Sequence, residues 1–123
     1  MLDVLLVALG AMAGAPLRYL VDRWISARHD TVFPWGTFTV NVAGSLVLGL
    51  VTGAAAAHGL PRSVVLLAGT GFCGALTTFS TFGYETVRLV EDGAYGYAAG
   101  NVLGSAAAGL MAVTAGYALA TSL

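Results

Sequence analysis

The chain contains four apolar runs, each long enough to cross a lipid bilayer. The runs cover residues 4–21, 33–57, 64–90 and 94–119 of a 123-residue sequence. A spanning helix needs about 20 apolar residues, because each residue advances the helix by ~1.5 Å. Only 9% of the residues are charged and the mean hydropathy is +0.85, which leaves too few polar groups for a water-facing surface. We therefore expect an all-α membrane protein with four transmembrane helices in a single domain, residues 1–123.

The third run carries polar residues that a simple spanning helix does not need. From Gly71 to Phe82 it reads GFCGALTTFSTF, with three threonines, one serine and two glycines. Glycine is conformationally permissive, and threonine or serine hydroxyls compete for nearby main-chain carbonyls. The density of hydroxyls predicts a third helix broken at mid-membrane, where bare carbonyl oxygens could bind a cation. The alternative is a continuous helix whose glycines and threonines pack against a neighbour.

Counting residues from the ends of the runs places several polar and aromatic side chains at similar depth. The chain alternates sides, so the first and third runs end on the membrane face where the second and fourth begin. Asn41, Asn101 and Phe82 are then each roughly 10–12 Å below that face. Arg18 lies near the same face and Thr77 lies near the bilayer centre. These positions suggest a polar route from that face toward the middle of the membrane.

Each of these residues also has a structural interpretation. Arg18 could reach the headgroups or pair with Asp22, or it could attract an anion into a vestibule. Asn41 could hydrogen-bond another helix, or its amide could donate to an anion. Phe79 and Phe82, three apart on one helix face, could be lipid-facing, or their electropositive ring edges could hold a small anion.

Two further polar positions stay open at this point. Asn101 and Ser105 are four residues apart and share a helix face, so they could line a polar route, while the glycines around them indicate helix packing. Glu85 lies five residues before the end of its run and is expected to reach the membrane interface.

Three motifs resemble those of the CrcB/Fluc family of fluoride channels. They are GAMAGAPLRY at 10–19, GTFTVNVAGS at 36–45 and GFCGALTTFSTF at 71–82, and the resemblance extends over essentially the whole chain. It implies a passive, fluoride-selective channel that lowers cytoplasmic fluoride and its toxicity. It also implies an antiparallel, dual-topology dimer of four-helix subunits in the cell membrane, with two fluoride pathways.

The resemblance further assigns roles to individual residues. A structural Na⁺ at the dimer centre would be bound by the main-chain carbonyls of Gly74 and Thr77. Arg18 would lie at the vestibule of the fluoride pathway. The pathway itself would be lined by seven residues: Asn41, Phe79, Phe82, Ser80, Thr81, Ser105 and Asn101. The sequence departs from the family at Ala75, where glycine is frequent, and at Asn101 and Gly109 in the fourth run.

The distribution of arginine bears on orientation and on the partner. Four of the five basic residues lie at or near one membrane face, and only Arg62 lies on the other. The positive-inside rule would place the arginine-rich face in the cytoplasm and both termini outside. This bias leaves two possibilities, a dual-topology homodimer or a dimer with an oppositely oriented paralogue.

Two functions compete with a fluoride channel. A small four-helix proton-coupled exporter of cations would need a titratable carboxylate deep in a span, and all the acidic residues lie at or close to span ends. A non-transporting membrane scaffold subunit would not need the TTFSTF sequence. An enzyme is not expected, because the spans contain no nucleophile–base set or carboxylate pair. Neither nucleic acid binding nor a metal site other than the Na⁺ is expected.

Overall fold

The computed structural model describes residues 1–123 and contains helices and short connections only. The elements are α1 (Leu2–Arg28), α2 (Trp35–His58), α3 (Arg62–Val64), η1 (Val65–Cys73), α4 (Gly74–Leu76), α5 (Ser80–Glu91) and α6 (Tyr95–Ser122). The elements α3 to α5 together form the third span. Four segments are long and apolar enough to cross a membrane, which confirms the prediction of an all-helical protein with four transmembrane segments.

Helix α1 continues well beyond the end expected for the first apolar run. The prediction stopped at Val21, because polar residues follow it in the sequence. No glycine or proline occurs between Val21 and Arg28, so the main chain continues as a helix after the apolar run has ended. The helix closes at His29, whose N–H donates to the carbonyl oxygen of Ile25.

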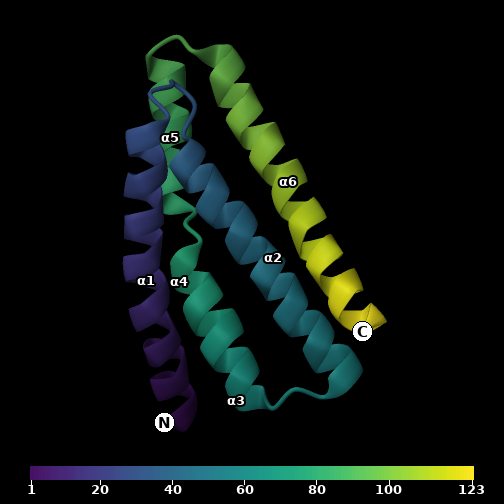
Figure 1. Cartoon of the computed structure of the whole chain (residues 1–123). Coiled ribbons are helices and arrows are strands. Elements are labelled where there is room, and N and C mark those ends of the chain that lie inside the picture. The colour runs from purple at the N-terminus through teal and green to yellow at the C-terminus, as the bar shows by residue number, and fades with distance from the viewer.

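The helices are arranged in order across the molecule (Figure 1). Helix α1 packs against η1 and α4, and α2 crosses diagonally between these elements and α6. Helix α6 contacts α2 along its length and α5 near the connection between them. Both termini lie at the same end of the bundle, and the connection between α1 and α2 lies at the opposite end.

Segment η1 is a π-helix of nine residues, and it approaches α1 closely through glycines on both helices. A methyl group added at Gly10 of α1 would meet the carbonyl oxygen of Leu67 and would lie 2.7 Å from the nitrogen of Phe72. A methyl group at Gly71 of η1 would meet the carbonyl oxygen of Val7. Small residues allow the two backbones to touch, which is the usual way that membrane helices pack.

The same device joins α2 to α6. A methyl group at Gly49 would meet the carbonyl oxygen of Val113, and one at Gly116 would meet the carbonyl oxygen of Leu46. At the far end of this pair, the ring of His58 hydrogen-bonds the carbonyl oxygen of Ala120 at 3.0 Å. Helices α2 and α6 are therefore fixed to each other along a glycine-lined contact.

A single ion pair is present, and it lies at the end of the bundle that holds the termini. The Arg62 guanidinium donates to the carboxylate of Asp3 at 2.9 Å, which joins residues 59 positions apart in the sequence. Both side chains are largely exposed, so the pair itself adds little stability. It marks the point where the start of the third span lies beside the start of the first.

The α1–η1 contact predicts a specific sensitivity to added volume. Gly10→Ala should destabilise the protein by about 1–3 kcal/mol, because main-chain atoms of η1 occupy the space that the new methyl group would need. Thermal unfolding of detergent-solubilised protein measures the loss. Gly100→Ala is the matched control, because open space surrounds that position on α6. Equal melting temperatures for the two variants would contradict the close contact.

Candidate functional site

The third span is interrupted between α4 and α5 by three residues that are not helical. Helix α4 ends at Leu76, Thr77 has an extended backbone with φ −80° and ψ 155°, and α5 begins at Ser80. The predicted break therefore follows the glycines and does not coincide with them. Gly69 and Gly71 lie within η1, and Gly74 is the first residue of α4.

Two consecutive threonines stabilise the two sides of this break. The Thr77 hydroxyl donates to the carbonyl oxygen of Cys73 at 2.9 Å, and the Thr77 N–H donates to the same oxygen. The Thr78 hydroxyl accepts a hydrogen bond from the N–H of Thr81 at 3.2 Å and so satisfies one of the free N–H groups in the first turn of α5. The sequence TT thus ends one helix and starts the next.

The side chain of Asn41 on α2 fills the gap between the two helix ends. Its Nδ2 donates to the carbonyl oxygen of Thr78 at 3.0 Å, and its Oδ1 accepts from the N–H of Thr78 at 2.7 Å. One amide side chain therefore satisfies both main-chain groups of a residue that the helix no longer satisfies. This contact gives Asn41 the structural role considered from the sequence, a hydrogen bond to another helix, and it also places the side chain beside the break.

Other main-chain groups at the break have no partner within the chain. No hydrogen bond ends on the carbonyl oxygens of Gly74, Ala75 or Thr77. Thr78, the residue that would bond Gly74 in a continuous helix, donates to Asn41 instead. A methyl group at Gly74 would meet no atom within 4 Å, so this side of the break is open. These carbonyls can bind a hard cation, which prefers oxygen ligands.

A groove of about 480 Å³ runs beside the break and is bounded by the third span, α2 and α6. It brings together four of the residues expected to line the fluoride pathway, from three different helices and the break. These are Asn41, Phe79, Phe82 and Ser105. The rest of the lining is mostly apolar or small, and it contains no charged residue.

The two phenylalanines lie at the open side of the groove. Their ring centroids are 6.0 Å apart and the rings are tilted by 43°. Phe79 is 84% exposed, although it lies in the middle of a membrane span. A ring in this position offers its edge and face to whatever enters the groove or covers it.

Arg18 and Thr81 lie outside the groove. They line a second cavity of about 190 Å³ between α1, α2 and α5, together with Asp22 and Thr37. Thr78 contributes to the walls of both cavities. The sequence left open an ion pair between Arg18 and Asp22, and this pair does not form. Asp22 instead lies against the backbone at Gly36 and accepts a hydrogen bond from Ser26.

Asn101 is 1% exposed and holds α6 to α5. Its Nδ2 donates to the Thr86 hydroxyl at 2.9 Å, and its Oδ1 accepts from the Ser105 hydroxyl at 3.2 Å. Asn101 therefore orients Ser105, which lines the groove, and does not line it itself. Thr86, its partner, was not identified from the sequence, because a single threonine on a helix gives no signal of its contacts.

These contacts relate Asn41 and Asn101 to particular residues of the third span. Asn41 contacts Thr78, four residues before Phe82 in the third span, and Asn101 contacts Thr86, four residues after it. The difference arises because α2 and α6 cross the third span at an angle (Figure 1). Residue counts along tilted helices do not give equal depths.

Two other polar residues lie apart from the groove. Ser80 is exposed at the start of α5, with its hydroxyl 3.4 Å from that of Thr78. Glu85 lines a polar cavity of about 340 Å³ near the α1–α2 connection, together with His29 and Arg88. Its Oε1 is buried without a hydrogen-bond partner.

Comparison with known sequences shows the relationship of the chain. The profile of the family described as "CrcB-like protein, Camphor Resistance (CrcB)" matches residues 5–117. The chain belongs to the CrcB family. This confirms the resemblance found in the three sequence motifs.

Curated relatives match almost the entire chain. The chain is 61% identical to a protein of Streptomyces avermitilis and to one of Frankia casuarinae, each match covering 97% of this chain and 96% of the relative. It is 48% identical to a protein of Thermobifida fusca, over 95% of this chain and 94% of the relative. All three relatives are named fluoride-specific ion channel FluC 1. These relatives confirm the prediction that the chain is not an enzyme, and with the four spans they identify a multi-pass membrane protein.

The Asn41–Thr78 contact predicts the effect of a nearly isosteric change. Asn41→Asp replaces the donor Nδ2 by an oxygen that faces the Thr78 carbonyl oxygen, so a hydrogen bond becomes a repulsive contact. The variant should lose about 1–3 kcal/mol of stability. Thermal unfolding in detergent measures the loss. Ser45→Ala on the same helix is the control, because its hydroxyl bonds only the carbonyl oxygen of Asn41 in its own helix. A wild-type melting temperature for Asn41→Asp would show that this pairing does not hold the break.

Proposed function

We propose that the protein is a fluoride-selective channel through which fluoride crosses the membrane passively. The observation that carries this proposal is the groove beside the helix break, which combines Asn41, Ser105 and two phenylalanine rings inside a membrane span. The proposal is supported by the relatives, which are named fluoride-specific ion channels and match the chain over nearly its full length.

The chemistry of the groove suits a small anion in transit. The amide of Asn41 has a second N–H beyond the one given to Thr78, and the edge of a phenylalanine ring is electropositive. Neither group carries a full positive charge, and Arg18 lies in the separate cavity. Weak donors in series allow an ion to bind and leave, whereas a buried arginine or lysine would retain it.

The groove requires a second subunit to become a closed pathway. Phe79 is 84% exposed and the break is open at Gly74, so one subunit alone leaves this part of the span uncovered. An antiparallel dimer covers it with a second copy of the chain or with an oppositely oriented paralogue. Such a dimer contains two grooves, one from each subunit, and hence two fluoride pathways.

The free carbonyls at the break favour a structural Na⁺ at the centre of this dimer. The oxygens of Gly74 and Thr77 lack hydrogen-bond partners, and unwound membrane helices bind Na⁺ through such carbonyls. Two copies of the break would together provide the oxygen ligands. When bound, the ion supplies fixed positive charge that stabilises both the exposed carbonyls and the nearby anion.

In the cell, this activity would lower cytoplasmic fluoride. Fluoride moves down its own electrochemical gradient, so a passive channel in the cell membrane exports it when its cytoplasmic level is high. The competing function, proton-coupled export of a cation, finds no support in the groove, because no carboxylate lines it.

Fluoride efflux from liposomes that contain the purified protein tests the proposal. We expect rapid fluoride efflux and no measurable chloride efflux. Phe79→Ile should slow fluoride several-fold, because it removes a ring edge worth about 1 kcal/mol to the passing anion. Phe38→Ile is the matched control, because Phe38 lies in the aromatic cluster with Phe33 and Trp35, away from the groove. Equal passage of chloride and fluoride would reject a selective channel.

Removal of Na⁺ tests the cation site separately. Protein purified and reconstituted with N-methylglucamine in place of Na⁺ should lose most of its fluoride efflux and melt at a lower temperature. Restoring Na⁺ should recover both, whereas adding back only more N-methylglucamine chloride should recover neither. Full activity and stability without Na⁺ would show that the free carbonyls do not hold this ion.

A further inference from the structure

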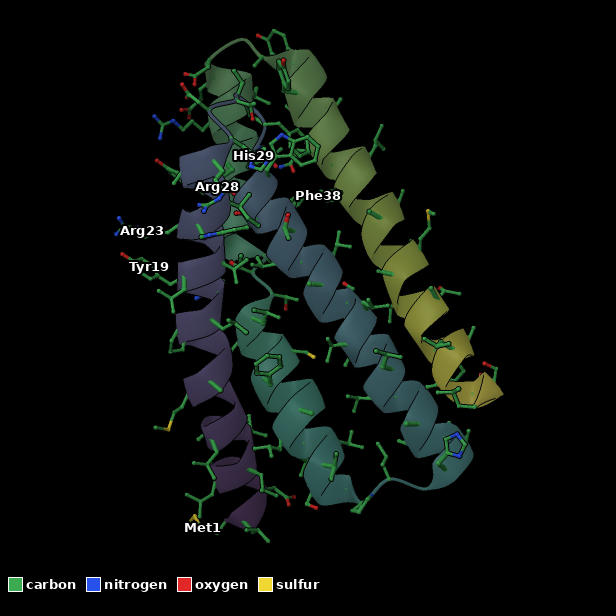
Figure 2. All side chains as sticks on the ribbon, viewed as in Figure 1. Met1, Tyr19, Arg23, Arg28, His29 and Phe38 are labelled. Atoms are coloured by element: carbon green, nitrogen blue, oxygen red, sulfur yellow. The ribbon has the colours of Figure 1, made fainter.

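Two arginines on the last turns of α1 are each held against an aromatic ring of the same helix. Arg23 donates to the Tyr19 hydroxyl at 2.9 Å, with its Cζ 5.7 Å from the ring centroid. The Cζ of Arg28 lies 4.2 Å from the centroid of the Trp24 ring. Both pairs join residues one helical turn apart, and Figure 2 shows Tyr19 and Arg23 projecting together from the outer side of α1.

Neither arginine is neutralised by a carboxylate. The Arg62–Asp3 pair at the opposite end of the molecule is the one ion pair in the structure. Asp22 is adjacent to Arg23 in sequence, but its carboxylate contacts the backbone at Gly36 on α2. The two guanidinium groups therefore have donors free for a ligand.

The surroundings of both pairs are those of the membrane interface. Tyr19 and Trp24 are 58% and 57% exposed, and both lie close to the point where the apolar part of α1 ends. Tyrosine and tryptophan are enriched at the level of the lipid headgroups, where the ring is partly in lipid and the polar atom is in water. An arginine held against a ring at this level is within reach of lipid headgroups.

We propose that the Tyr19–Arg23 and Trp24–Arg28 pairs each bind the phosphodiester group of an anionic phospholipid. Guanidinium groups bind phosphate oxygens through two parallel hydrogen bonds. The rings hold each guanidinium in place, which lowers the entropy lost when the phosphate binds. This site is separate from the groove and does not depend on which ion the groove conducts.

General attraction to a negative membrane does not account for such binding. The end of the molecule that holds these pairs also holds more acidic than basic residues. The arginines there are Arg18, Arg23, Arg28 and Arg88, and the acidic residues are Asp22, Asp30, Glu85, Glu91 and Asp92. Selectivity for an anionic lipid would therefore come from the local arrangement on α1, where cations stand without acidic partners.

Tryptophan fluorescence tests the site directly, because the chain has two tryptophans and one of them is Trp24. In a Trp35→Phe background, Trp24 is the remaining tryptophan and can be excited selectively over the tyrosines. The protein is reconstituted in vesicles of one fixed ratio of phosphatidylglycerol to phosphatidylcholine, with either lipid brominated. We expect brominated phosphatidylglycerol to quench Trp24 well beyond its mole fraction. This measurement uses the protein with Tyr19, Arg23, Trp24 and Arg28 unchanged. If each lipid quenches Trp24 only in proportion to its mole fraction, the proposal is overturned.

Charge-removing variants then assign the binding to these arginines. The double variant R23Q/R28Q should reduce the preference for phosphatidylglycerol on the order of tenfold. The variant R23K/R28K, which keeps the charges but loses the paired hydrogen bonds, should fall between it and the parent protein. R88Q is the matched control, because it removes a charge at the same end of the molecule from α5. An equal loss in R88Q and R23Q/R28Q would mean general surface attraction and would overturn the site.

Discussion

The pairing of the Asn41 side chain with the main chain of Thr78 is the contact on which the rest of the structure depends. Inside a bilayer, a main-chain group without a hydrogen bond costs several kcal/mol. Interrupting the third span would leave both groups of Thr78 exposed to this cost, and Asn41 satisfies both. The interruption in turn turns Phe79 outward, frees the carbonyls of Gly74 and Thr77, and opens one wall of the groove.

The glycine contacts determine where the molecule is closed and where it is open. Helix α1 is joined to η1 through Gly10 and Gly71, and α2 is joined to α6 through Gly49 and Gly116, with backbones in direct contact. Helix α6 makes no comparable contact with η1 or α4. A space therefore remains between α6 and the third span, and this space, which α2 also lines, is the groove. In the sequence these glycines indicate only ordinary packing of membrane helices. In the structure they also determine where the candidate site lies.

Much of this arrangement could be predicted from the sequence, because the relevant signals are local. Hydropathy alone identifies four spans, and the hydroxyl-rich sequence from Gly71 to Phe82 identifies the span that breaks. The exact position of the break could not be predicted, because it depends on Asn41, which is 37 positions from Thr78. For the same reason, the position of Asn101 in the sequence gives no sign of the hydrogen bonds by which it contacts Thr86 and orients Ser105. Helix tilt and cross-helix bonds are not encoded in the spacing of residues along one helix.

The ion pair between Asp3 and Arg62 has a consequence for how the chain enters the membrane. The two residues meet only when the start of the third span lies against the start of the first, after the first three spans are in place. While the chain is being inserted, Arg62 is an unpaired charge, and the insertion machinery responds to it as such. The charge distribution that determines topology during biosynthesis is therefore different from that of the folded protein. In the folded protein the exposed Arg62 guanidinium is paired with Asp3, so its charge is offset only once the spans have come together.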